Sequence, residues 1–176
     1  MAAKMARILE TERLVLRTWE REDVDTIFKI CSNADVMLHI GDGNRFEKIE
    51  DAEKFLDWTF SNQITYGLSR YAVIEKASGK IAGSCGFALL NNGEIELGYL
   101  FGKDFWGKGF ATEAANACVK YGFDKLGFTN LVALTDIDHA ETHRVLEKIG
   151  FTRRGIEKIH IDDDLVFEIK NQSETV

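Results

Sequence analysis

Long apolar runs, a signal-peptide pattern and a surplus of basic residues are all missing from this sequence of 176 residues. No segment is long and apolar enough to cross a bilayer, and the first residues, MAAKMAR, lack the apolar stretch of a signal peptide. We therefore expect a cytoplasmic protein that does not contact membranes. The net charge of -7 argues against nucleic-acid binding, which usually requires a basic stripe. An acidic surface that favours solubility is the simplest interpretation, and attraction of a cationic molecule is the alternative.

Paired cysteines and proline are also missing. Cys31, Cys85 and Cys118 lie far apart, without a C-x-x-C pair, and each stands within an apolar stretch. We therefore expect reduced, buried cysteines, and we expect no metal. Proline does not occur at all, and nothing in the sequence explains its absence.

The residues that are present predict one globular domain. The chain has no low-complexity tract, and 176 residues are enough to bury a sizeable core. We predict a single domain over residues 1–176, with flexible ends at 1–7 and 171–176.

Hydrophobic periodicity predicts one mixed sheet flanked by helices. Strand patterns occur at residues 10–19, 68–76, 80–90, 94–101, 130–137, 151–161 and 165–170, and helical patterns occur at 21–32, 48–60, 111–126 and 139–150. The short connections among the second to fourth strands favour antiparallel hairpins. The fold class is therefore α/β (α+β), with a mixed, mostly antiparallel sheet of about seven strands and four helices.

The stretch FWGKGFATEA, from Phe105 to Ala114, places two glycines around a lysine at the predicted start of a helix. Gly107 and Gly109 would leave backbone N–H groups free at the positive end of the helix dipole, with no Cβ to block an anion, and Lys108 could add a charge. The pattern predicts a phosphate site, and an ordinary tight turn is the alternative. The spacing does not fit a Walker A loop, and the dinucleotide fingerprint would require a third glycine where Thr112 stands.

Three segments in order carry a resemblance to a known family: ETERLVLR, then ELGYLF followed by WGKGFATEA, then THRVLEKIGF. They resemble the GNAT superfamily of acetyl-CoA-dependent N-acetyltransferases, and especially its branch of Rim-type ribosomal-protein N-terminal acetyltransferases. The resemblance runs from Leu9 to about Lys170. Trp106 replaces the Gln or Arg that usually opens the family's loop pattern, a departure that is common in the Rim-type branch.

The resemblance implies direct transfer of an acetyl group from acetyl-CoA, as co-substrate, to a primary amine, with a protein N-terminal α-amine favoured. Polyamines, aminoglycosides and free amino acids stay open as acceptors. A non-catalytic acyl-CoA-binding module and, more distantly, a nicotinamide-dependent enzyme are the alternatives from other classes. Whether the protein is a monomer or a homodimer does not follow from the sequence.

The resemblance also implies which residues hold the cofactor. Backbone amides from Trp106 to Thr112 would cradle the CoA pyrophosphate, and β-strand residues before them would pair with the pantetheine arm. His139 replaces an asparagine that usually lies near this arm, and a simple helix cap is the alternative for it. The implied cofactor-binding residues are Tyr99, Leu100, Phe101, Trp106, Gly107, Lys108, Gly109, Phe110, Ala111, Thr112, His139 and Thr142.

Acetyl transfer requires a neutral amine. At neutral pH, deprotonation costs about 4 kcal/mol for a lysine side chain and about 1 kcal/mol for an α-amine. Glu96 is the candidate general base, acting through water, because the family often keeps a carboxylate on this strand; an ion-pair partner or sheet-surface charge is the alternative. Thr142, at the position of a family serine, can offer its hydroxyl to the departing thiolate.

Other polar and aromatic residues are less informative. His39 lies where the family shapes its acceptor pocket, although a surface histidine without a catalytic role is the commoner case. Four aromatic residues could line an acceptor cleft, although core packing is the default for such a stripe. They are Phe46, Phe55, Trp58 and Phe60.

Overall fold

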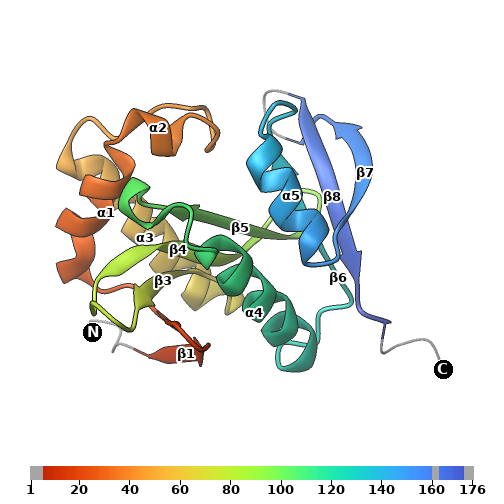
Figure 1. Ribbon diagram of the computed structural model, residues 1–176, viewed down its shortest axis with the longest axis horizontal. Helices are drawn as coiled ribbons and strands as arrows, with labels where there is room; N and C mark the ends of the chain where they lie inside the picture. Colours follow the sequence, from red (N-terminus) through yellow and green to blue (C-terminus); the bar gives the residue numbers. More distant parts are fainter. Residues whose placement is uncertain (1–5, 160–162, 173–176) are drawn as a thin grey trace.

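The computed structural model describes residues 6–159 and 163–172. Within these ranges the chain forms one eight-stranded sheet with α-helices on both faces (Figure 1). The strands are β1 (Arg7–Glu10), β2 (Leu14–Arg17), β3 (Arg70–Glu75), β4 (Ile81–Leu89), β5 (Ile95–Phe101), β6 (Asn130–Thr135), β7 (Thr152–Glu157) and β8 (Asp164–Lys170). The α-helices are α1 (Val24–Cys31), α2 (Ala34–Met37), α3 (Ile49–Tyr66), α4 (Phe110–Asp124) and α5 (Ala140–Lys148), and 3₁₀ turns occur at η1 (Arg21–Asp23) and η2 (Lys103–Phe105).

The sheet is mixed and mostly antiparallel, which confirms the predicted fold class. Its strand order is β1-β2-β3-β4-β5-β6-β8-β7. All neighbours are antiparallel except β5 and β6, which run parallel and pair only at Glu96 and Val132. Beyond this pair, the described residues of β5 and β6 no longer pair with each other toward their C-terminal ends. The backbone of β5 from Tyr99 to Phe101 therefore lacks a strand partner on that side.

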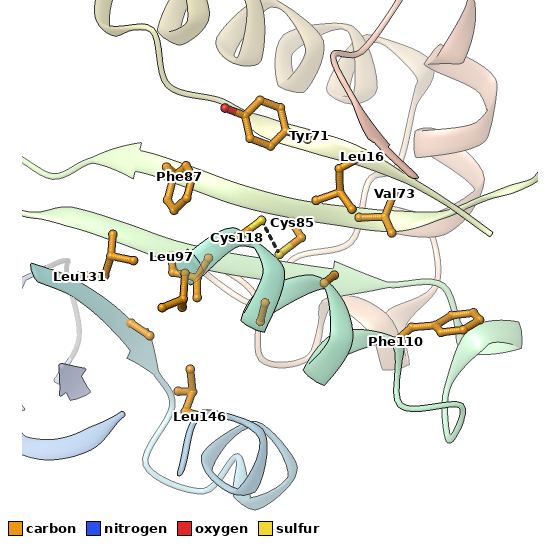
Figure 2. Close-up of a cluster of buried hydrophobic side chains, with 14 of the residues drawn as sticks. Leu16, Tyr71, Val73, Cys85, Phe87, Leu97, Phe110, Cys118, Leu131 and Leu146 are labelled. Atoms are coloured by element: carbon orange, nitrogen blue, oxygen red, sulfur yellow. Dashed lines mark hydrogen bonds between the residues drawn. The ribbon is translucent and has the colours of Figure 1, made fainter. Parts of the chain in front are cut away.

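Helices cover both faces of the sheet, and α4 and α5 lie on the face opposite α1 and α3 (Figure 1). Alternation along β3 sends Tyr71 and Val73 into the core beneath α4, while Ala72 packs against the cluster formed with α1 and α3. Figure 2 shows Cys118 of α4 reaching Cys85 of β4, with their Sγ atoms 3.6 Å apart. All three cysteines are free and buried, as the sequence predicted.

Two short elements were not predicted, namely β1 and α2. β1 begins at Arg7, inside an end that was expected to be flexible, and it pairs with β2 at the edge of the sheet. Residues 1–5, 160–162 and 173–176 lie outside the described residues, together with most of both expected flexible ends and part of the closing hairpin. Among the helices that the structure does describe, none has the length and apolar character of a membrane span.

Candidate active site

The loop between β5 and α4 folds as its glycines predict. Gly107 and Gly109 have φ values of +73° and +77°, in the left-handed region that favours glycine. Gly109 is the N-cap, so that α4 begins at Phe110. The N–H groups of the first helical turn have no acceptor within the helix, and they lie at the positive end of its dipole. The loop therefore presents a ready site for an anion.

Arg13, which the sequence did not single out, braces this loop. Its guanidinium lies over the ring of Phe110, 4.9 Å from the centroid, and donates through Nη1 to the carbonyl oxygen of Lys108 at 2.8 Å. Its Nε donates to Oε2 of Glu113 at 2.7 Å. Burial raises the pKa of Glu113, but hydrogen bonds from Thr11 and Arg13 outweigh burial and leave that pKa below its usual value. Arg13, directly before β2, thus holds the first turn of α4 in place.

Two adjoining pockets lie beside β5, and one of them reaches the glycine loop. The larger, here the loop pocket, has a volume of about 590 Å³ and runs from the glycine loop past the end of β5 to the first turns of α5. The smaller, here the sheet pocket, has a volume of about 300 Å³ and lies between α3, β5 and β6. Six residues line both pockets and form what we call the neck: His39, Ile40, Tyr99, Leu100, His139 and Thr142.

The residues expected to hold a cofactor lie together along the loop pocket, with one exception. From Tyr99 through Thr142, all of them line it except Lys108. The ammonium of Lys108 instead lies 3.2 Å from Oε1 of Glu75 and faces the rings of Phe105 and Phe110. The positive charge that Lys108 could have added is therefore directed to Glu75.

Glu96 lines the sheet pocket, but its carboxylate is engaged. Nη2 of Arg70 donates to its Oε2 at 2.5 Å, and Nη1 of Arg70 donates to the carbonyl oxygen of Gly86 at 3.2 Å. The two charged side chains are only 13% and 14% exposed, so solvent screens their pairing weakly. The Arg70 guanidinium lies where a Cβ on Gly98 would be, only 1.6 Å from that position, which explains the glycine there. The carboxylate of Glu96 is therefore already engaged by Arg70.

The neck brings together hydroxyl and imidazole groups from three elements. The hydroxyl of Tyr99 on β5 is buried and has no well-formed hydrogen bond to a described residue. Burial raises the pKa of Tyr99 far above its usual value, and nearby Thr142 opposes this shift. His139, at the N-cap of α5, makes no side-chain cap hydrogen bond, and burial followed by the proximity of His39 lowers its pKa. Burial therefore favours the neutral forms of Tyr99 and His139, and the hydroxyl of Thr142 carries no charge.

Sequence reasoning located some aromatic residues and missed two important contacts. Phe55 and Trp58 line the sheet pocket, whereas Phe46 and Phe60 pack against the core cluster of α1 and α3. The contact of His39 with Asp136 joins residues 97 positions apart, and the pair of Arg70 with Glu96 joins residues 26 apart. No local pattern predicts either contact, because each depends on how distant segments meet in the fold.

The comparison with known families decides the assignment. The family described as acetyltransferase (GNAT) domain matches residues 13–152. This chain belongs to the GNAT acetyltransferase family. Its resemblance to that family is confirmed, and GNAT membership makes it an enzyme that transfers an acyl group to an amine.

The names of proteins similar to this GNAT enzyme do not point to one acceptor. YkkB from Bacillus subtilis is 34% identical over 146 residues, which are 81% of this chain and 83% of YkkB. Spermidine N(1)-acetyltransferase from Escherichia coli is 28% identical, over 80% of this chain and 73% of that enzyme. A structure of RimL, the ribosomal L7/L12 alpha-N-protein acetyltransferase, in complex with coenzyme A has a TM-score of 0.81 at 16% identity, covering 94% of this chain and 98% of RimL. The likeness to RimL shows a shared fold.

Proposed function

We propose that this GNAT enzyme transfers an acetyl group from acetyl-CoA directly to the α-amine of a protein N-terminus. The observation that carries the proposal is the course of the loop pocket. It begins at the anion site of the glycine loop and ends at the neck, where a second pocket opens. A donor with a phosphate end and a reactive thioester end fits this course, and the acceptor amine approaches from the sheet pocket.

The loop pocket matches the parts of acetyl-CoA in order. The N–H groups after Gly109 suit the pyrophosphate, since a helix N-terminus binds anions without requiring a basic side chain. The unpaired backbone of β5 from Tyr99 to Phe101 suits the amides of the pantetheine arm, which can extend the sheet like an added strand. The thioester then lies at the neck beside Thr142, whose hydroxyl can donate to the sulfur as the carbon–sulfur bond breaks.

The sheet pocket favours an acceptor with a single amine. Among the described residues that line it, Arg70 and Glu96 are the only ones with permanently charged side chains, and they neutralise each other. Spermidine carries several ammonium groups and would require unpaired carboxylates. An α-amine also costs about 3 kcal/mol less to deprotonate at neutral pH than a lysine side chain. Phe55 and Trp58 offer apolar contacts to the first side chain of a peptide.

The test is turnover against a panel of acceptors. Thiol release from acetyl-CoA is followed with peptides that have a free α-amine, the same peptides acetylated at the N-terminus but carrying a lysine, spermidine, and an aminoglycoside. We expect the free α-amino peptides to give the highest kcat/KM. Faster turnover of spermidine would contradict the proposed acceptor, and CoA binding without turnover of any amine would indicate a binding module.

Removing the brace on the loop should weaken cofactor binding. Replacing Arg13 by alanine deletes the hydrogen bond to the Lys108 carbonyl and the pairing with Glu113, so that the loop loses its fixed position. Charge-assisted hydrogen bonds contribute about 1.5–3 kcal/mol, and we expect the Kd of CoA to rise at least about tenfold by calorimetric titration. Arg7→Ala is the matched control, because Arg7 pairs with Glu10 within β1 and lines neither pocket. Equal affinity in the two variants would show that Arg13 does not position the loop.

A further inference from the structure

His39 and Asp136 form a contact across the mouth of the neck. His39 follows α2, and its Nδ1 lies 2.8 Å from Oδ2 of Asp136, directly after β6. A carboxylate at this distance accepts a hydrogen bond, so Nδ1 carries a proton, and in the neutral imidazole Nε2 is then the nitrogen with the free lone pair. The His39 side chain is 27% exposed, and therefore it is shielded without being sealed from water. The pair has the composition of a base and the carboxylate that orients it.

Both members of this pair are held in place. The ring of His39 stacks on the ring of His139, with centroids 4.2 Å apart and planes inclined by 20°. The carbonyl oxygen of Asp136 accepts hydrogen bonds from the backbone N–H of His139 at 3.2 Å and from Nε2 of buried His143 at 3.0 Å. On the other side of the cleft, the carboxylate of Asp35 in α2 pairs with Lys103 of η2. The imidazole of His39 is thus held by stacking on His139 and by its contact with Asp136.

Position separates His39 from the other candidate base. His39 lines both pockets, whereas Glu96 lines only the sheet pocket and is bound by Arg70. The amine and the thioester can meet only where the two pockets join. Of these two candidates, only His39 lines the junction of the pockets, and its hydrogen-bond partner is a carboxylate and not a cation.

We propose, building on the acetyl transfer described above, that His39 is the general base for the acceptor amine and that Asp136 is its positioning residue. Nε2 of His39 takes a proton from the acceptor ammonium, directly or through one water. The freed lone pair forms the new bond to the thioester carbon, and collapse of the adduct breaks the carbon–sulfur bond with its electron pair on sulfur. The second nitrogen proton passes to the CoA thiolate, and the proton on His39 passes to solvent, so that one proton is released per turnover.

The surroundings of His39 define what a pH profile can report. Asp136 faces it from the end of β6 and His139 faces it from α5. The remaining ionisable residues that line the two pockets are Asp35, Arg70, Glu96, Tyr99 and Glu141. The pH profile of the parent enzyme alone therefore does not identify the group that causes the acidic limb of kcat/KM. Each variant's profile is compared with that of the parent to identify it.

His39→Asn is the informative variant, because its side-chain amide can still donate to Asp136 while the basic Nε2 is gone. We expect kcat to fall about 100-fold or more, the acidic limb of kcat/KM to disappear, and the Kd of CoA to change less than threefold. In His39→Ala, added imidazole should restore part of the rate. Asp136→Asn should lower kcat about tenfold and shift the limb, whereas Asp138→Asn makes the same charge change in the same exposed loop without contacting His39 and serves as its control.

Two outcomes would overturn the proposal. One is a His39→Asn enzyme with near-parental kcat and an intact acidic limb. The other is loss of that limb in Glu96→Gln alone, which would make Glu96 the base. Nitrogen NMR of the imidazoles gives a readout that needs no acceptor: we expect His39 in the Nδ1–H form in the parent, and an Nε2–H form there would contradict the pair even if no amine in the panel were acetylated.

Discussion

Replacing Gly109 by valine is expected to weaken CoA binding at least 100-fold in a protein that still folds. The φ of +77° at this N-cap is costly for any residue with a Cβ, and most costly for a β-branched one. The loop must therefore change its backbone angles, which turns the N–H groups of the first turn of α4 away from the anion. A Cβ there would make only an ordinary contact with Nη2 of Arg13, at 3.5 Å, so the expected effect comes from the backbone angle. Calorimetric titration with CoA measures the effect.

Gly127→Val is the matched control for this variant. Gly127 has a similar φ of +71°, a Cβ there would meet nothing within 4 Å, and it lies beyond the C-terminal end of α4, away from both pockets. Each substitution should destabilise the protein by about 1–3 kcal/mol through backbone strain. Only the Gly109 variant should lose CoA. An unchanged affinity in folded Gly109→Val protein would refute the assignment of the loop as the pyrophosphate site.

Replacing Arg70 by methionine is expected to lower the free energy of unfolding by about 3 kcal/mol. The variant leaves the carboxylate of Glu96 without a partner at a site where it is only 14% exposed. An unpaired, poorly hydrated charge costs more than the pair contributes. The double variant Arg70→Met, Glu96→Gln removes the charge as well, so we expect it to recover most of the lost stability in urea denaturation at neutral pH.

Arg153→Met controls for the substitution itself. Arg153 pairs with Glu147 at 3.1 Å, but these side chains are 57% and 48% exposed, and an exposed pair contributes about 1 kcal/mol or less. The contrast between the two arginines isolates the effect of burial. A single Arg70 variant as stable as the Arg153 variant would show that water reaches Glu96 and that the carboxylate is hydrated in the folded protein.

The fold was largely predictable because the local periodicity of apolar residues indicates most of its helices and strands. The long helices α3 and α4 and the strands β3 to β5 repeat their apolar residues over enough positions to be recognised. By contrast, α2 has four residues, about one helical turn and too few for a helical period to show, and β1 has four residues without alternation. β1 also buries no residue fully, so its sequence RILE carries no alternation between a core face and a solvent face.

Of the site's geometry, the sequence predicted the backbone of the glycine loop but not the partners of the charged side chains. Gly107 and Gly109 reveal the loop because a positive φ constrains the residue type locally. The partners of charged side chains depend on strand register and on how loops meet, which no local pattern encodes. Glu96 was therefore identified without Arg70, and His39 without Asp136. Glu96 remains a candidate base by position, and its pairing with Arg70 is the physical reason to prefer His39.

The single pairing between β5 and β6 has a consequence for how the protein opens. Few backbone hydrogen bonds can join β1 to β5 with β6 to β8, so shared side-chain packing beneath α4 and α5 must link these two blocks. Because few backbone hydrogen bonds join the two blocks, the block of β6 to β8 can open while the rest stays folded. We therefore expect the amides of β6 and β8 to exchange with solvent at a lower free energy of opening than those of β3 and β4. Bound CoA would span the gap and link the blocks thermodynamically. Hydrogen exchange with and without CoA should then show amides of β8 gaining protection although no residue of that strand lines the loop pocket.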